Sequence, residues 1–124
     1  MSQKIRCHSE LDSNGYAESI VQEDTTRCFA CGRRDRKLDR HEVWQGALRN
    51  KSKAYGLWVC LCHDPCHTGS DGIHNHPERS YGLRAYAQAK AMKKYGWTTE
   101  EFTKLFYKNY LERMEENDSE GKNP

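Results

Sequence analysis

The sequence predicts a small α+β domain in which a bound metal ion supports a short β-structure and helices follow toward the C-terminus. Only 35% of the 124 residues are hydrophobic, so the apolar core is small for the length of the chain. Six cysteines are available to staple such a core, either as disulfides or as metal ligands. Strand-like segments occupy the middle of the chain, and Ala- and Lys-rich helical segments follow them. The length fits one domain.

The N-terminal residues MSQKIRCHSE include no apolar run typical of a signal peptide, and no stretch of the sequence is apolar enough to cross a membrane. We therefore expect an intracellular, cytoplasmic protein with no membrane partner. Thiols stay reduced in that compartment, so we expect the cysteine pairs to bind metal rather than to form disulfides.

The first half of the chain is predicted to be mainly β-structure. Residues 1–27 form an N-terminal β-hairpin-like extension, because Asn14-Gly15 favours a tight hairpin turn. A strand is expected at residues 38–44 and another at residues 56–62, where GLWVCLC has the β-branched and aromatic content of a buried strand. Between them QGALRNKSKAYG is polar, basic and bounded by glycines, which indicates a loop.

C-terminal helices are expected over residues 77–115. Proline suits the first turn of a helix, so a helix is predicted to start near Asp64-Pro65 and to be interrupted at HTGSDG. From Pro77 the chain is Ala- and Lys-rich and reads as helix until Gly96 ends it.

The last helix has the clearest pattern. Thr98 with Glu101 forms a capping box at its start. Residues 116–124 are polar and charged and are predicted to be a disordered tail. Four apolar residues recur at helical spacing and indicate a core-facing side rather than a base-stacking surface: Phe102, Leu105, Phe106 and Tyr110.

Two cysteine pairs have the spacing of one zinc site. Cys28 and Cys31 are separated by two residues, and such a knuckle points both sulfurs at one position. Cys62 and Cys66 can do the same where a strand ends and a helix begins. Four thiolates about 2.3 Å from a tetrahedral Zn²⁺ form a closed structural site, and such a site contributes folding free energy.

Other Cys and His residues are alternative ligands. The second pair is separated by three residues rather than the commoner two, so Cys60 or His63 could replace one of its members. Cys60 equally fits a small buried hydrophobe, which is the preferred interpretation. Cys7-His8 has no nearby partner and is expected on a plain surface strand.

Three histidines lie near these cysteines. His41 is in the first predicted strand, His67 directly follows Cys66, and His74 is one loop further on. If the strands pair and a helix packs across them, the three imidazoles meet on one face. Imidazoles that leave coordination positions open bind a divalent cation able to polarise a phosphate and to activate water. The sequence therefore predicts a second metal site.

The order of these motifs resembles that of the HNH, or ββα-metal, nucleases. The resemblance rests on CFACGRRDRKLDRHEVW, on WVCLCHDPCH and on the further histidine, and it covers residues 28–76, well under half of the chain. The chain is most similar to small Cys-bearing HNH-like proteins of bacteriophages and prophages, which often carry a segment like KYGWTTEEFTKLFYKNYL. The resemblance implies that residues 28–76 form a zinc knuckle plus a zinc-stabilised ββα-metal, treble-clef-like core, in a bacterial host cell.

The family's roles carry over residue by residue. By this resemblance His41 binds the catalytic ion and Glu42 is the general base, with His67 and His74 completing the ligand set and His76 as an alternative to His74. The ion would be Mg²⁺, Mn²⁺, Ni²⁺ or Zn²⁺. Basic residues would hold the phosphate backbone without sequence specificity: Arg40, Arg49, Lys51 and Lys53.

Two departures from the family's pattern bear on catalysis. The usual base is His, whereas this chain has Glu42, which is a base if its environment tunes it, an inactive substitution, or a third metal ligand. In a shifted register His41 would itself be the base. The family's middle Asn, which orients the first motif, is replaced by Gly56, with Asn50 the only nearby substitute.

The charge distribution bears on the partner. The net charge is only +2, but residues 27–53 include nine Lys/Arg against three Asp/Glu. Beside a metal-type cluster this fits a phosphate backbone as partner, although such a run alone is more often a solvated face. The first function expected is a metal-dependent HNH-like endonuclease that hydrolyses DNA, with RNA also open. The alternative is a catalytically silent zinc-binding module that binds nucleic acid or a host protein as a phage accessory factor.

Overall fold

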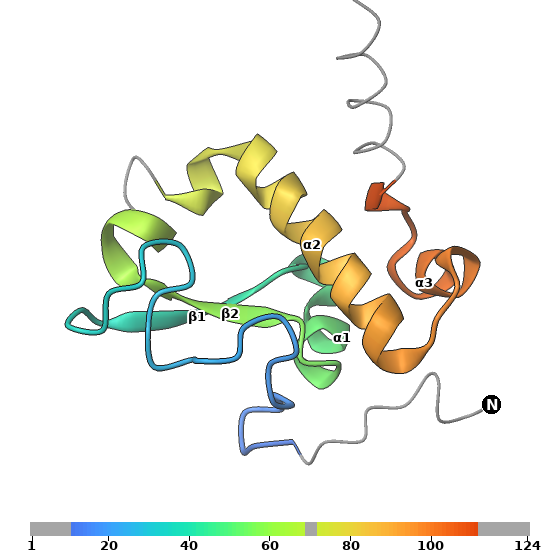
Figure 1. Ribbon diagram of the computed structural model, residues 1–124, viewed down its shortest axis with the longest axis horizontal. Helices are drawn as coiled ribbons and strands as arrows, with labels where there is room; N and C mark the ends of the chain where they lie inside the picture. The colour runs from blue at the N-terminus through green and yellow to red at the C-terminus, as the bar shows by residue number, and fades with distance from the viewer. Residues whose placement is uncertain (1–10, 69–71, 112–124) are drawn as a thin grey trace, which may run out of the picture.

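The computed structural model describes residues 11–68 and 72–111, which form an α+β fold with a two-stranded sheet and three α-helices (Figure 1). Helix α2 crosses the sheet, and residues 11–27 run along the side of the sheet away from it (Figure 1). Within these described ranges, no helix has the length and apolar character needed to cross a membrane. The elements are β1 (Leu38–Glu42), α1 (Arg49–Ala54), β2 (Trp58–Cys62), α2 (Pro77–Tyr95) and α3 (Thr99–Phe106).

The two predicted strands pair as an antiparallel hairpin, with every residue of β2 buried. Successive side chains on a strand point to opposite faces. Asp39 and His41 therefore share one face of β1, and Arg40 and Glu42 share the other. Accordingly, the Arg40 guanidinium lies 4.4 Å from the centre of the Tyr16 ring in the N-terminal segment.

The connection between the strands is helical, so the predicted loop is wrong there. Residues Gly46–Leu48 form a short 3-10 turn and residues 49–54 form α1. The run RNKSKA contains good helix formers, and the glycines that suggested a loop stand only at the ends. Gly56 ends the connection with φ +73° and brings the chain back into β2.

Ser52 of α1 joins the two ends of this connection by hydrogen bonds. Its buried hydroxyl accepts a hydrogen bond from the N–H of Trp44 at 3.2 Å and donates one to the carbonyl of Leu57 at 2.6 Å. These bonds join the residues after β1 to those before β2. Asn50, the expected substitute for the family's asparagine, is instead exposed on α1.

The N-terminal segment contains the predicted turn but, over residues 11–27, no strand. Asn14-Gly15 forms the turn, with Gly15 at φ +86°. The following backbone bonds to the connection between the strands, where Ile20 N–H donates to the Gly56 carbonyl at 2.9 Å. Instead of a hairpin, residues 16–27 follow an irregular path with bends and turns. Residues 1–10, with Cys7-His8, and the tail 116–124 lie outside the described residues.

The helix predicted to start at Asp64-Pro65 is only a single turn. Residues His63–His67 curl once, Asp64 has extended φ/ψ of −144° and 129°, and the Asp64-Pro65 peptide bond is cis. The long helix starts later, at Pro77. The second helix, predicted from Pro77 until Gly96, is confirmed, because α2 spans Pro77–Tyr95.

Helices α2 and α3 complete the core. The capping box of Thr98 and Glu101 is confirmed, and Gly96 ends α2 in the left-handed conformation. Helix α3 stops at Phe106, earlier than predicted, because Tyr107 takes a positive φ of 71°. The predicted apolar side packs around Trp44, whose ring centroid lies 4.7–5.6 Å from those of three residues: Phe102, Phe106 and Tyr110.

Candidate metal centres

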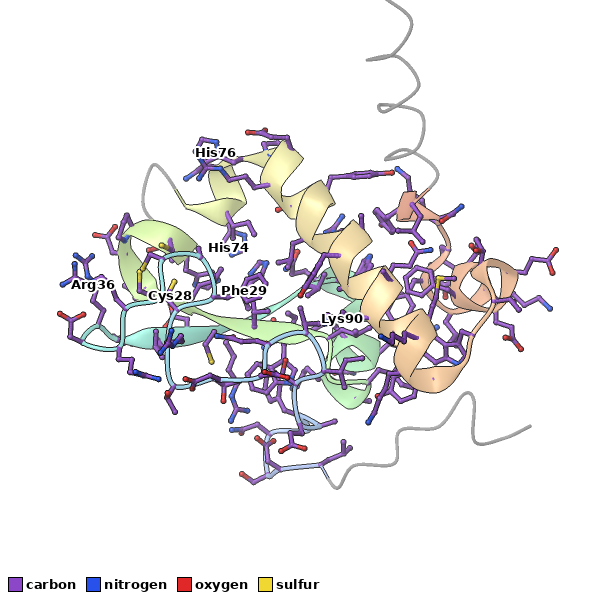
Figure 2. All side chains as sticks on the ribbon, in the orientation of Figure 1. Cys28, Phe29, Arg36, His74, His76 and Lys90 are labelled. Carbon is purple, nitrogen blue, oxygen red and sulfur yellow. The ribbon has the colours of Figure 1, made fainter. Side chains whose placement is uncertain are left out.

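Four cysteine sulfurs converge at one end of the hairpin, as predicted. The Sγ atoms of Cys28, Cys31, Cys62 and Cys66 lie within 4.8 Å of one another, and all four thiols are free (Figure 2). The Cys31 and Cys62 sulfurs are 4.0 Å apart. Thiolates around a tetrahedral zinc with bonds of about 2.3 Å are separated by about 3.8 Å. The four donors therefore fit a single metal ion.

The backbone of the knuckle favours a thiolate at Cys28. Gly32, at φ +79°, turns the chain so that its N–H donates to the Cys28 carbonyl at 2.8 Å. Burial raises the pKa of Cys28, but backbone N–H groups, those of Cys62 and Cys31 first, outweigh burial and lower it to about 7. Burial and hydrogen bonds to the other sulfurs raise the pKa of Cys66, so this thiol keeps its proton until a cation replaces it.

The two alternative ligands lie elsewhere. Cys60 is buried against Tyr16 and Trp58, on the face of the hairpin that the N-terminal segment covers. Burial raises the pKa of its thiol. It is a small buried hydrophobe, the preferred interpretation from the sequence. His63 is exposed, and its Nδ1 donates to Asp39 Oδ2 at 2.7 Å.

Three histidines form the second cluster, so their predicted convergence is confirmed. His41 on β1, His67 in the turn after β2 and His74 in the turn before α2 have ring nitrogens within 4.8 Å of one another. The Nε2 atoms of His67 and His74 are 3.0 Å apart. Three imidazoles leave coordination positions open, which a catalytic metal needs. His76, the alternative to His74, instead has its Nδ1 at 3.5 Å from Glu78.

Asp39 orients this cluster and was not predicted to take part. Its Oδ2 accepts hydrogen bonds from Nδ1 of His67 at 2.9 Å and from Nδ1 of His63 at 2.7 Å. The bond puts the His67 proton on Nδ1 and leaves Nε2 free toward the cluster. Metal-binding histidines usually donate their other ring N–H to a carboxylate, a backbone carbonyl or water. The Asp-x-His spacing on β1, which puts both side chains on one face, was an available signal.

His41 and His74 are poised to bind a cation at neutral pH. Burial, then the charges of His67, His74 and Arg84, lowers the pKa of His41 to about 3. Burial and His67 also lower the pKa of His74. Neutral imidazoles offer a free lone pair, which is the form that binds divalent ions.

Glu42 has partners other than these histidines. Its buried carboxylate accepts a hydrogen bond from the Tyr16 hydroxyl and lies 3.5 Å from Nε of Arg49. The side chain stands on the face of β1 opposite His41, because the two residues are consecutive on a strand. The role of general base, which the family resemblance implies for Glu42, stays a prediction.

The predicted phosphate-binding residues lie apart from the histidines. Arg40 and Lys53 are over the Tyr16 ring, at 4.4 and 4.7 Å from its centre, and Arg49 pairs with the carboxylate beside that ring. Lys51 donates at 2.8 Å to a backbone carbonyl of α3. These four side chains are thus engaged on the other face of β1 or against α3.

A polar cleft of about 580 Å³ opens beside His74 and contains a cation that was not predicted, Arg84 of α2. Its Nε donates to the Val43 carbonyl at 3.1 Å, and Nη2 lies 3.5 Å from the Gln45 side-chain oxygen. These contacts fix the guanidinium within the cleft. An anchored guanidinium beside a metal-type cluster suits a phosphate oxygen.

Comparisons with known proteins give no match: no protein-family model, no curated protein and no solved structure is significantly similar to the chain. The geometry alone defines its class. It is a small α+β protein with two groups of residues able to hold metal ions, one of four thiols and one of three imidazoles.

Proposed function

We propose that this protein is a divalent-metal-dependent endonuclease of the HNH-like type that hydrolyses DNA phosphodiester bonds. In this proposal residues 28–76 form a zinc-stabilised ββα-metal, treble-clef-like core. Zinc on the four cysteines is the structural ion, and a second ion on His41, His67 and His74 is the catalytic one. One observation carries the proposal: three imidazoles converge beside a cleft that contains Arg84.

The chemistry of the two donor sets supports this division of roles. Four thiolates complete a tetrahedral shell, so that ion is closed to substrate and contributes to folding. Three imidazoles leave positions free, and an ion bound there supplies polarisation of a phosphate oxygen and activation of water. Different requirements thus explain why one small chain gathers two sets of metal-binding side chains.

The chain's own residues would position the substrate. Asp39 holds the His67 ring by its Nδ1 proton at 2.9 Å, which keeps Nε2 aimed at the cluster. Arg84, anchored on the Val43 carbonyl, would donate to a non-bridging phosphate oxygen and neutralise charge that develops in the transition state. His74 is exposed at the cleft, where substrate would approach.

Plasmid nicking tests the proposal. The wild-type chain is incubated with supercoiled DNA and Mg²⁺, Mn²⁺, Ni²⁺ or Zn²⁺, and His74→Ala is compared with His76→Ala. Both substitutions remove one imidazole from the same short segment, but only His74 belongs to the cluster. We expect nicking that His74→Ala abolishes and His76→Ala retains. Wild-type nicking no faster than that of His74→Ala, with every ion, contradicts the proposal.

The second candidate is the catalytically silent module, which the contacts of Glu42 favour. A carboxylate held by Tyr16 and Arg49 is not free to take a proton from water. In this case the wild-type chain would retain DNA on a filter without cutting it. Retention would decrease steeply with salt, because phosphate contacts release counterions.

A further inference from the structure

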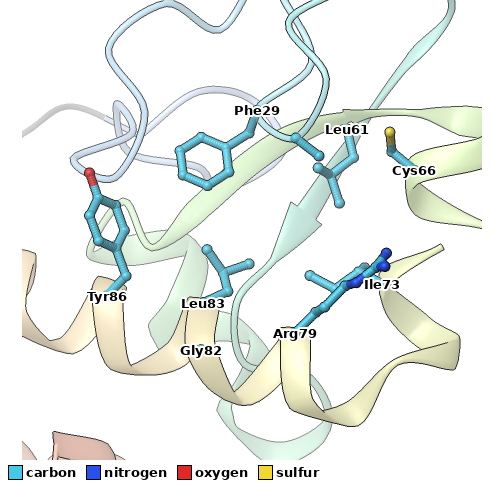
Figure 3. Close-up of a pocket in the computed structure, with 9 residues that line it drawn as sticks. Phe29, Leu61, Cys66, Ile73, Arg79, Gly82, Leu83 and Tyr86 are labelled. Carbon is cyan, nitrogen blue, oxygen red and sulfur yellow. The ribbon is translucent and has the colours of Figure 1, made fainter. Parts of the chain in front are cut away.

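An apolar pocket of about 450 Å³ lies between the cysteine knuckle and α2, with lining residues distinct from those of the histidine cleft (Figure 3). Two aromatic rings stand at its rim, Phe29 of the knuckle with 38% of its surface exposed and Tyr86 of α2 with 46% exposed. Their centroids are 6.1 Å apart, and the ring planes are tilted by 43°. Leu61 and Leu83 form the buried wall behind them. Large rings left in solvent around an apolar pocket indicate a binding site.

Gly82 keeps this pocket open. It lies within α2, where glycine is less favourable than any residue except proline. Its φ is outside the left-handed region, and a Cβ built on it would meet no atom within 4 Å. Neither backbone conformation nor close packing therefore requires a glycine here. The absent side chain leaves space on the helix side of the pocket, where Gly82 is one of the lining residues.

Two cationic side chains lie at or near the pocket, Arg79 and Lys90. Among the described residues that line it, the one charged side chain is Arg79, which is drawn beside Ile73 at one edge of the pocket (Figure 3). Nζ of Lys90 lies 5.4 Å from the centre of the Tyr86 ring. The pocket thus suits an occupant that combines a flat apolar group with negative charge. An unpaired nucleotide has both, since its base stacks on aromatic rings while its phosphate meets a cation.

The pocket and the histidine cleft meet at consecutive residues, because Ile73 lines the pocket and His74 lines the cleft. A strand whose phosphate lies in the cleft would therefore pass the pocket within a few nucleotides. We infer that the pocket binds an unpaired base of that strand, so that the preferred substrates are single strands, flaps or bulges. This inference rests on the proposed function for its substrate, and its test is separate.

Filling the pocket tests the inference. Gly82→Leu adds a side chain with high helix propensity, and Ala89→Leu adds the same side chain at an exposed position of α2 outside the pocket. Both are made in the full chain with His74→Ala, which keeps the probe uncut. The probes are a 2-aminopurine oligonucleotide, whose fluorescence is quenched by stacking, as a single strand and as a full duplex. Gly82→Leu should bind the single strand about tenfold more weakly and abolish the quenching, without changing duplex binding.

The Ala89→Leu chain should bind both probes like its parent. Equal single-strand binding by the Gly82→Leu and Ala89→Leu chains overturns the inference, as does a parent chain that binds the single strand no better than the duplex. The second result would instead indicate that the pocket binds an apolar side chain of a protein partner. If Gly82→Leu does not fold, as judged by thermal melting, Tyr86→Ala replaces it, because this exposed ring is not part of the core.

Plasmid nicking by the wild-type chain separates the two proposals. Nicking without quenching of 2-aminopurine fluorescence overturns the base pocket but does not contradict the proposed function. A signal that Gly82→Leu removes, together with no nicking by any ion, supports the base pocket in a binding module and contradicts hydrolysis.

Discussion

The carboxylate of Asp39 accepts a hydrogen bond from Nδ1 of His67 at 2.9 Å, while Nε2 of the same ring lies 3.0 Å from Nε2 of His74. Asp39 is on β1, two residues before His41, and His67 is in the turn that follows β2. One bond therefore joins β1 to the turn after β2 at the point where the three imidazoles meet. It also sets which ring nitrogen faces a cation.

Asp39→Ala is expected to weaken divalent-metal binding at the histidines by about 10- to 100-fold, because His67 loses the partner that orients it. Asp39→Asn keeps an acceptor without the charge and should lie between wild type and Asp39→Ala. Titration with Co²⁺, followed by its visible absorption, measures the affinity. Asp12→Asn is the control, since its carboxylate pairs with Arg40 on the opposite face of β1. Unchanged Co²⁺ affinity in Asp39→Ala would show that the bond has no such role.

Cys62→Ala should destroy the structural metal site, whereas Cys60→Ala should not. Both thiols are buried on β2, but only the Cys62 sulfur belongs to the cluster. We expect the Cys62 variant to lose its tightly bound zinc and its cooperative melting transition. The Cys60 variant should keep the metal and lose about 1 kcal/mol of stability. Elemental analysis and thermal melting measure both, and zinc retained by the Cys62 variant would argue against a four-thiolate site.

Without an ion on its histidines, the chain should lose stability as the pH falls below about 6.5. The pKa of His41 falls from 6.5 to about 3 in the folded chain because the ring is buried near other cationic groups. The unfolded chain therefore binds the extra proton in this window, and acid favours unfolding. From about pH 7 to about pH 5 the loss should be about 2 kcal/mol.

Urea unfolding of wild type and His41→Gln at these two pH values isolates the effect. Glutamine cannot take up the proton, so His41→Gln should show a smaller decrease in unfolding free energy between about pH 7 and about pH 5. An equal decrease in both proteins would mean that His41 titrates normally in the folded chain.

Glu42→Gln separates a structural from a catalytic carboxylate. The amide can still accept the Tyr16 hydrogen bond, so the fold should be kept, and losing the partly exposed pair with Arg49 should cost at most about 1 kcal/mol. If the contacts seen here persist during hydrolysis, nicking should change by less than about threefold. A decrease of about 100-fold or more, with metal binding intact, would restore Glu42 as the general base.

Gly56→Ala should destabilise the protein far more than Gly96→Ala. Both glycines have φ near +70°, which costs alanine about 1 to 2 kcal/mol. A Cβ at Gly56 would also overlap the Glu18 carbonyl, while one at Gly96 would meet no atom within 4 Å. We expect about 3 kcal/mol of destabilisation for Gly56→Ala and about 1 kcal/mol for Gly96→Ala, by urea unfolding. Equal effects would mean that residues 18–20 do not pack on the hairpin.

The hairpin, the last two helices and both ligand clusters could be predicted because their signals are local. Cys28 and Cys31 carry their own turn, and the WVCLC run is buried in any fold that covers both faces of the strand. Thr98 and Glu101 form hydrogen bonds within one helical turn, so no distant residue affects them. Cys66 and His67 follow β2 closely in the chain. Pairing of the strands therefore also positions one member of each cluster.

What could not be predicted depends on contacts between distant segments. Arg84 meets the Val43 carbonyl across 41 residues, and no motif marks it. The buried Ser52 bonds that tie residues 49–54 to Trp44 and Leu57 are not marked by any motif in this polar, glycine-bounded run. The grouping of Arg40 with the histidines as phosphate ligand was avoidable. Since Arg40 and His41 are consecutive on a strand, strict alternation already places them on opposite faces.

Cys66 and His67 are neighbours in the chain, so a single peptide link joins the sulfur cluster to the imidazole cluster. Oxidation of the thiolates would therefore also displace His67, although the oxidant does not react with the imidazoles. On the proposed division of roles, the ion on the thiolates would be acquired before the imidazole centre assembles. For the proposed nuclease, chains made under zinc starvation would then lack both centres and should not nick DNA.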